Sequence, residues 1–112
     1  MALPKSIQSA ATQIQPFIRK TPFIHSKAFS ELTGADVWFK LESFQITGSF
    51  KARGATNKLL SLTDEEKANG VVSASTGNHG AAVAYAAGKL GIDCTIYVPD
   101  DVSAAKLENM KQ

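Results

Sequence analysis

Two short apolar runs on either side of an alanine-rich stretch constrain the fold of this chain more than any other feature. Val71-Val72-Ser73-Ala74 is too short for a helix and rich in β-branched residues, so it predicts a buried strand. A turn at residues 75–77 leads into a predicted helix over 78–90, and residues 92–98 predict a second buried strand. A strand, a helix and a strand joined by short turns favour a parallel sheet with right-handed crossovers.

The preceding residues extend this alternation. Residues 36–41 have the composition of a strand, and a helix is predicted from about Ser49 to Leu60, with Phe50, Ala55, Leu59 and Leu60 as packing positions. The motif Thr63-x-x-Glu66 predicts a capped helix that ends at Gly70. We therefore expect an α/β fold: an open parallel sheet in three layers with helices on both faces, left incomplete where the last predicted helix, capped by Asp100, Asp101 or Ser103, ends at Gln112.

The first fifty residues do not share this alternation. A helix is predicted over residues 6–15, with Ser6 as its N-cap and Pro16 just beyond its end. Residues 17–24 predict an extended loop or an edge strand, because Pro22 cannot donate a hydrogen bond inside a sheet. A second helix is expected from the cap Ser26 to Leu32, with Gly34 ending it.

Composition and charge exclude several classes of protein. The 112 residues carry a formal charge of +2 without a basic block, so no nucleic-acid partner is expected. Neither a signal peptide nor a membrane-spanning run is visible, which favours a cytoplasmic protein with no membrane partner. His25, His79 and Cys94 are the only histidines and cysteine, so no metal site is expected, and Cys94 is interpreted as a buried structural residue.

Lys51 is the first candidate for chemistry. It falls in the first turn of the predicted helix, where the helix dipole and unpaired N–H groups favour a neutral amine that can act as nucleophile or base. Gly48 permits a tight approach of the backbone, and Phe50 offers an apolar wall. A lysine in a helix is, however, usually a solvated surface charge, so the functional interpretation depends on a second site.

The turn Ser75-Thr76-Gly77-Asn78-His79-Gly80 supplies that second site. It lies between a predicted strand and a helix N-terminus, where open α/β sheets bind ligands, and it offers hydroxyls and free amides that suit a carboxylate or another small anion. In the alternative interpretation Asn78 is only an N-cap, Gly77 a turn residue and His79 a capping or solvent-facing side chain. Two glycines flank Asn78 and His79, which is more than a simple cap requires.

Together these stretches resemble the fold type II pyridoxal-phosphate enzymes, in the branch of the threonine and serine dehydratases and serine racemases. Residues 40–55 (Lys40-Leu41-Glu42-Ser43-Phe44-Gln45-Ile46-Thr47-Gly48-Ser49-Phe50-Lys51-Ala52-Arg53-Gly54-Ala55) are similar to the family's lysine segment, and residues 75–80 to its substrate and cofactor loop. Arg19-Lys20-Thr21-Pro22 also resembles the family's N-terminal signature. The resemblance covers nearly the whole chain.

The resemblance implies roles for six residues. Lys51 would carry pyridoxal 5′-phosphate as a Schiff base and remove the Cα proton of the substrate, Asn78 would bind the phenolic oxygen of the cofactor, and Phe50 would pack near its ring. Ser75 and Thr76, with the amides around Asn78 and His79, would bind the carboxylate of the amino-acid substrate. Elimination of the β-hydroxyl would then give a 2-keto acid and ammonia. Thr76 would also act in catalysis: racemases of the family have a serine at its position, which protonates the second face of Cα, so racemisation is expected to be weak here.

Length is the larger departure from the family. Family members are about three times as long, so the resemblance implies an N-terminal piece in which residues 1–48 belong to the large domain and residues 49–112 to part of the small domain. By itself such a piece is expected to bind the cofactor poorly and to lack turnover, and the full-length form is expected to be a homo-oligomer. Two alternatives stay open: a serine racemase or related hydroxy-amino-acid lyase, and a non-catalytic module that binds a small ligand or a partner chain.

Overall fold

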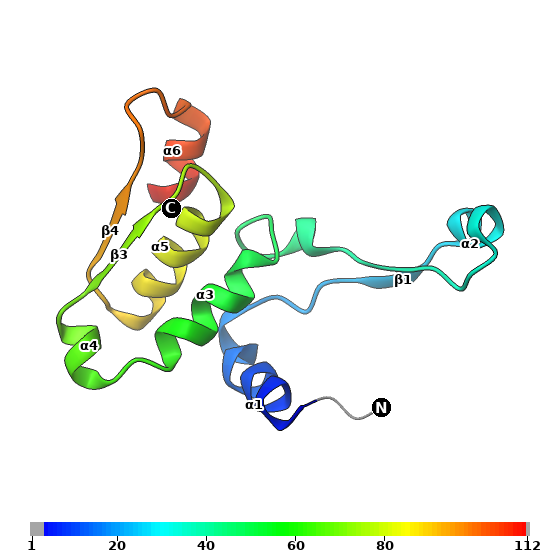
Figure 1. The fold of residues 1–112 in the computed structure, drawn as a ribbon, viewed down its shortest axis with the longest axis horizontal. Coiled ribbons are helices and arrows are strands. Elements are labelled where there is room, and N and C mark those ends of the chain that lie inside the picture. Colours follow the sequence, from blue (N-terminus) through cyan, green and yellow to red (C-terminus); the bar gives the residue numbers. More distant parts are fainter. Residues whose placement is uncertain (1–3, 112) are drawn as a thin grey trace.

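The computed structural model describes residues 4–111, and the second half of the chain has the alternation predicted from sequence (Figure 1). Its elements are α3 (Lys51–Leu60), α4 (Asp64–Ala68), β3 (Val71–Ala74), α5 (Asn78–Leu90), β4 (Cys94–Tyr97) and α6 (Ala104–Lys111). β3 and β4 pair in parallel, in a register that runs from Val71 opposite Cys94 to Ala74 opposite Tyr97. The sheet is incomplete, as expected, because these two strands are its only members among the described residues.

Local capping signals were predicted correctly in this half. Thr63 Oγ1 accepts a hydrogen bond from the Glu66 amide at 3.2 Å, and the Glu66 carboxylate accepts one from the Thr63 amide at 2.8 Å, which completes the capping box. Gly91 ends α5 in the left-handed region with a φ of 66°. Helix α6 begins directly after Ser103, whose carbonyl accepts from the Lys106 and Leu107 amides.

The two parallel strands are only half buried, so the prediction of buried strands is wrong. Residues along each strand alternate between partly buried and exposed. Val71 and Ile96 pack against the core, whereas Val72 and Tyr97 on the opposite face are 70% and 65% exposed. The reason is that α5 covers one face of the pair and no described element covers the other. Cys94 is half buried against the core, and desolvation raises the pKa of its thiol.

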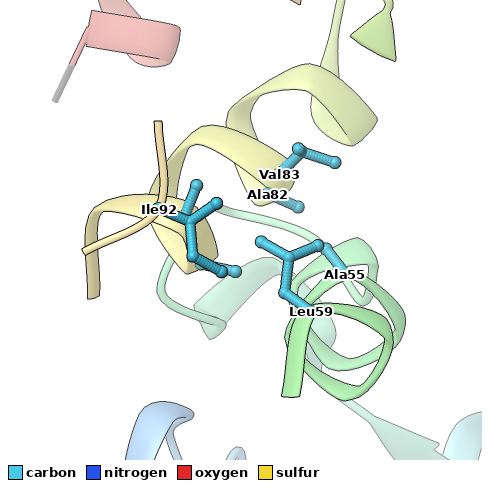
Figure 2. Packing of buried hydrophobic residues seen from close by; sticks show 7 residues of the cluster. Ala55, Leu59, Ala82, Val83 and Ile92 are labelled. Atoms are coloured by element: carbon cyan, nitrogen blue, oxygen red, sulfur yellow. The ribbon is translucent and has the colours of Figure 1, made fainter. Parts of the chain in front are cut away.

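Packing of α3 against α5 forms the core (Figure 2). Figure 2 shows Ala55 and Leu59 of α3 facing Ala82 and Val83 of α5. Alanines at the contact allow the two helices to approach closely. The buried cluster comprises Ala55, Leu59, Ala82, Val83, Ala86, Ala87 and Ile92, and Leu60 is half buried. The packing predicted for Phe50 is wrong, since its side chain is 61% exposed.

The first half of the chain forms a helix and a projecting arm (Figure 1). Its elements are α1 (Lys5–Ile14), a 3₁₀ turn η1 (Gln15–Phe17), β1 (Phe23–His25), α2 (Lys27–Thr33), β2 (Trp38–Lys40) and a 3₁₀ turn η2 (Glu42–Phe44). β1 and β2 form an antiparallel pair of their own, so the strand predicted at residues 36–41 does not join the parallel sheet. Of residues 17–24, predicted as an extended loop or an edge strand, Phe23 and Ile24 belong to β1, whereas Phe17 lies in η1.

Helix boundaries in this half agree with the prediction in one case and differ in the other. Ser26 Oγ accepts from the Phe29 amide at 3.4 Å and Gly34 ends α2 with a φ of 69°, as predicted. Ser6 is not an N-cap, because α1 already begins at Lys5, directly after Pro4. Pro16 lies just beyond the end of α1 at Ile14, as predicted, and falls within the 3₁₀ turn η1 that follows. No helix of residues 4–111 is long and apolar enough to cross a bilayer.

Candidate active site

Lys51 is the first residue of α3, where the sequence predicted it. The chain reaches it through a tight turn at Gly48, which has a φ of 73° and donates its amide to the Gln45 carbonyl at 2.8 Å. Ser49 is buried, and its Oγ accepts the Lys51 amide at 3.3 Å. The left-handed conformation of Gly48 and the hydrogen bond from the Lys51 amide to Ser49 together fix the direction of the Lys51 side chain.

Lys51 lines a hollow of about 480 Å³ between α3 and β3. Lys51 Nζ is 5.1 Å from the centre of the exposed Phe50 ring, which is within cation–π range. Ser73 of β3, His79 of α5 and Lys58 of α3 also line the hollow, together with apolar residues of α3 and α5. The structure thus brings together three of the six predicted site residues: Lys51, Phe50 and His79.

The other three do not line this hollow: Ser75 and Thr76 lie in the turn before α5, and Asn78 is the first residue of α5. Gly77 occupies the N-cap position and Asn78 is the first helical residue, so the alternative interpretation of Asn78 as the N-cap is wrong. Ser75 caps the helix instead, because its Oγ accepts from the amides of Gly77 at 3.3 Å and Gly80 at 3.0 Å.

Capping by Ser75 leaves two backbone amides at the start of α5 without a partner among residues 4–111. The amides of Asn78 and His79 have no hydrogen-bond partner within residues 4–111, and the side chains of Thr76, Asn78 and His79 are exposed. Unpaired amides at the positive end of a helix favour a carboxylate or phosphate group. The two amides and three polar side chains therefore form an open, polar platform next to the hollow.

Gly80 explains why the turn needs a second glycine. A Cβ at this position would lie 3.1 Å from Cγ2 of Ile96, 3.2 Å from Sδ of Met110 and 3.3 Å from Cβ of Ser75. The first turn of α5 is thus packed tightly against β4, α6 and the serine that caps it. Close packing keeps the platform in place relative to the sheet.

Sequence reasoning missed an ion pair that supports the lysine segment. Arg53 Nε and Nη2 donate to the two Glu42 oxygens at 2.8 and 2.7 Å, and Thr21 Oγ1 donates to Glu42 at 2.6 Å. Hydrogen bonds from Arg53 are the largest cause that lowers the pKa of Glu42 to about 2, against the opposing effect of burial. One signal in the sequence could have revealed the pair: Glu42 is the only acidic residue of residues 40–55, a segment with three basic residues.

Gln45 ties the same two segments together through the backbone. Its side chain is 2% exposed; Oε1 accepts from the amides of Arg19 at 2.8 Å and Ile46 at 2.9 Å, and Nε2 donates to the Arg19 carbonyl at 3.0 Å. Lys40 Nζ adds a bond to the Thr21 carbonyl at 2.7 Å. The residues at 19–22 and 40–45 therefore act as a scaffold that holds the turn before Lys51, and they do not face the hollow.

A family model for pyridoxal-phosphate dependent enzymes matches residues 14–112. The chain belongs to this family. Catabolic L-threonine dehydratase of Staphylococcus aureus strain USA300 is 49% identical over 106 residues, which cover 94% of this chain and 31% of that enzyme. This family uses pyridoxal 5′-phosphate as its cofactor.

Solved structures of such enzymes have the same fold as the chain. Maize serine racemase superimposes with a TM-score of 0.88 at 43% identity, over 95% of this chain and 32% of that protein. A threonine deaminase from T.th. gives a TM-score of 0.79 at 34% identity, over 96% of this chain and 35% of that protein. The fold is therefore that of the type II pyridoxal-phosphate enzymes, and the chain spans about a third of the length of these relatives.

Proposed function

We propose that the chain is part of a pyridoxal-phosphate-dependent ammonia-lyase that eliminates the β-hydroxyl of L-threonine or L-serine to give a 2-keto acid and ammonia. The similarity to the Staphylococcus aureus threonine dehydratase supports the reaction class. The observation that carries the proposal is that Lys51, at the start of α3, lines the same hollow as His79, whose amide is one of two free amides at the start of α5. A nucleophilic amine and an anion site side by side are what an amino-acid substrate requires.

The residues present fit the cofactor. An exposed primary amine can hold its carbonyl carbon, the exposed Phe50 ring offers an apolar surface for its flat ring, and Asn78 is free to donate to its phenolic oxygen. When bound, pyridoxal phosphate withdraws electrons from the bonds at the substrate Cα. The chain's own task is to hold the substrate and move protons.

The turn before α5 would hold the substrate carboxylate. The free amides of Asn78 and His79 point from the positive end of the helix, and the exposed Thr76 hydroxyl can add a bond. Ser75 uses its oxygen as an acceptor for two amides, so its own O–H remains available to donate to the carboxylate.

Lys51 would carry the proton in the reaction. Its amine takes the proton from Cα, the bond between Cβ and the hydroxyl oxygen breaks, and the hydroxyl leaves as water once it is protonated. The resulting enamine hydrolyses to the 2-keto acid and ammonia. Racemases of the family have a serine at the position of Thr76, which protonates the second face of Cα. Threonine adds a methyl group and a stiffer χ1, so elimination is favoured over racemisation here.

A racemase is the second candidate, because serine racemases of maize and Dictyostelium discoideum are 43% and 42% identical to the chain. The proposal also includes a division into residues 1–48 of a large domain and 49–112 of a small domain, a cytoplasmic location and a homo-oligomeric full-length enzyme. The domain division and the homo-oligomer follow from the resemblance of the sequence to the family, and the cytoplasmic location follows from a sequence without a visible signal peptide or membrane-spanning run.

A chimaera tests the proposed function. In it these 112 residues replace the matching stretch of the Staphylococcus aureus threonine dehydratase. With pyridoxal phosphate and L-threonine we expect 2-keto acid and ammonia in equal amounts, and we expect Lys51→Ala to abolish both while the chimaera stays folded. A Lys51→Ala chimaera as active as its parent would contradict the assignment of Lys51.

A further inference from the structure

A second hollow, of about 540 Å³, lies on the side of α3 that faces α1. Figure 1 shows α1 and the start of the arm beside α3. Four basic residues from three separate parts of the chain line this basic hollow: Arg19, Lys20, Lys40 and Arg53. Helix α1 and the turn η1 contribute uncharged residues to its wall, and no acidic residue among residues 4–111 lines it. The basic hollow shares no lining residue with the hollow that contains Lys51.

Positive charge in the basic hollow is only partly neutralised. Arg53 pairs with Glu42 at 2.7 Å, whereas the other three basic residues have no ion pair within residues 4–111. The first acidic residue of the chain is Glu31, so α1 and the segment after it bring no negative charge. Like charges around one hollow repel one another, and a bound anion relieves that repulsion.

Two of the basic residues are held in place by the scaffold of residues 19–22 and 40–45. Gln45 fixes the backbone of Arg19 through hydrogen bonds of 2.8 and 3.0 Å. Lys40 Nζ donates to the Thr21 carbonyl at 2.7 Å, which leaves two of its three N–H groups to donate elsewhere. A site whose groups are already fixed loses less conformational freedom when a ligand binds.

Arg53 can bind an anion without giving up its ion pair. Its Nε and Nη2 donate to Glu42 at 2.8 and 2.7 Å, whereas Nη1 has no hydrogen bond within residues 4–111. The two N–H groups of Nη1 therefore remain as charged donors. An anion at Nη1 would join α3 to the basic residues of the arm, two residues along the chain from Lys51.

We propose that the basic hollow binds a phosphate group, either inorganic phosphate or a small aliphatic phosphomonoester. A phosphate group carries a charge of about −1.5 to −2 at pH 7, which suits three unpaired cations better than a single carboxylate does. Among the described residues, no aromatic ring lines the basic hollow, so a compact anion is favoured over a nucleotide, whose base would need a stacking partner. The site does not depend on the proposed function.

A titration of the isotope-labelled chain with inorganic phosphate tests the site by nuclear magnetic resonance, at an ionic strength held constant with chloride. We expect saturable shifts of the Arg53 Nε–H signal and of the amides of Thr12, Arg19 and Lys20, with little change at Glu108 on α6. Calorimetric titration of the chimaera with phosphate gives a second result, which does not require the chain to be stable alone.

Two further ligands identify the anion. Tighter binding of glycerol phosphate than of inorganic phosphate would assign the site to a phosphomonoester, and equal or weaker binding would assign it to free phosphate. Succinate, which offers two carboxylates, is expected to bind at least about 5-fold more weakly than phosphate. Succinate binding as tight as that of phosphate would overturn the phosphate assignment.

A pair of lysine variants separates the site from general charge effects. Lys20→Ala removes an exposed cation of the basic hollow and is expected to weaken phosphate binding at least about 5-fold. Lys106→Ala is the matched control, because Lys106 is an exposed lysine of α6 that does not line the basic hollow. It is expected to change binding less than about 2-fold, since salt screens distant exposed charges.

The outcomes distinguish this site from the proposed function. Equal weakening in both variants, or shifts that follow ionic strength and not phosphate, would overturn the site. Phosphate binding by the chain that is lost in the chimaera would show that another part of such an enzyme covers the basic hollow, and would also overturn it. Phosphate binding by a chimaera that does not turn over L-threonine would support the site and count against the proposed function.

Discussion

Arg53 and Glu42 form a two-pronged ion pair, with N–O distances of 2.7 and 2.8 Å, between the first turn of α3 and the segment before Lys51. The Glu42 side chain is 17% exposed and that of Arg53 32%. Such a pair is more rigid than a surface salt bridge, because both donors and both acceptors are fixed in one plane. It joins the residue two positions after the lysine to the scaffold at residues 19–22.

The first prediction concerns the pH dependence of stability. The pKa of Glu42 is lowered from 4.5 to about 2 in the folded chain, so its stabilising effect is complete above pH 4.5 and is lost as the pH falls towards 2. Allowing for solvent screening, the loss is on the order of 1 to 2 kcal/mol. Urea unfolding between pH 2 and 6 should show the free energy of unfolding falling with pH in the parent and falling less steeply in Glu42→Gln; Glu66, whose pKa is lowered by the Thr63 amide, keeps its own contribution in both.

Glu108→Gln is the control for that series. Glu108 is exposed on α6 and has no ion pair among the described residues, so its removal should leave the slope between pH 2 and 4.5 unchanged. If the free energy of unfolding of Glu42→Gln fell with pH as steeply as that of the parent, the ion pair would not be the source of the acid sensitivity.

The second prediction concerns Gly80. A methyl group here would come within 3.1 to 3.3 Å of Ile96, Met110 and Ser75, so Gly80→Ala should destabilise the chain by about 1 to 3 kcal/mol. Gly88→Ala in the same helix meets nothing within 4 Å and should stabilise the chain by up to about 1 kcal/mol, through helix propensity alone. Chemical denaturation of the two variants gives the comparison. Equal effects would contradict the close packing at the start of α5.

The third prediction concerns Gln45. Gln45→Leu removes the buried acceptor of the Arg19 and Ile46 amides, whose hydrogen bonds are partly buried, and should cost about 1 to 3 kcal/mol. Gln13→Leu at an exposed position of α1 should stay within about 0.5 kcal/mol of the parent. Thermal unfolding of both variants measures the difference. A mild effect of Gln45→Leu would mean that the turn before Lys51 does not depend on this scaffold.

Sequence rules succeeded where a feature depends on neighbours along the chain. The cap Ser26, the capping box at Thr63 and Glu66, and the end of α5 at Gly91 follow from backbone hydrogen bonds within a few residues. A helix start near Ser49 was predicted from the sequence, and α3 begins two residues later, at Lys51. These local signals position the lysine and the turn before α5, so much of the candidate site was visible in the sequence.

Features that depend on distant contacts were not predicted. Phe50 was expected to pack and is exposed, because the core forms on the face of α3 that carries Ala55 and Leu59. The partner of β2 is β1, a choice that composition does not determine. The bonds of Glu42 join residues 11 and 21 positions apart, and no periodicity marks such a network.

The last prediction concerns Thr76 in the chimaera. A serine at this position would keep the hydroxyl, remove the methyl group and free χ1, so the hydroxyl could reach the second face of the substrate Cα. We expect Thr76→Ser to raise the ratio of D-serine to pyruvate formed from L-serine at least about 10-fold, within the range that a well-placed proton donor supplies. Thr76→Val, which has no hydroxyl, is the matched control and should form no D-serine. Chiral chromatography of both products gives the ratio, and D-serine formation that keeps pace with pyruvate in the parent chimaera would contradict the expectation that elimination dominates.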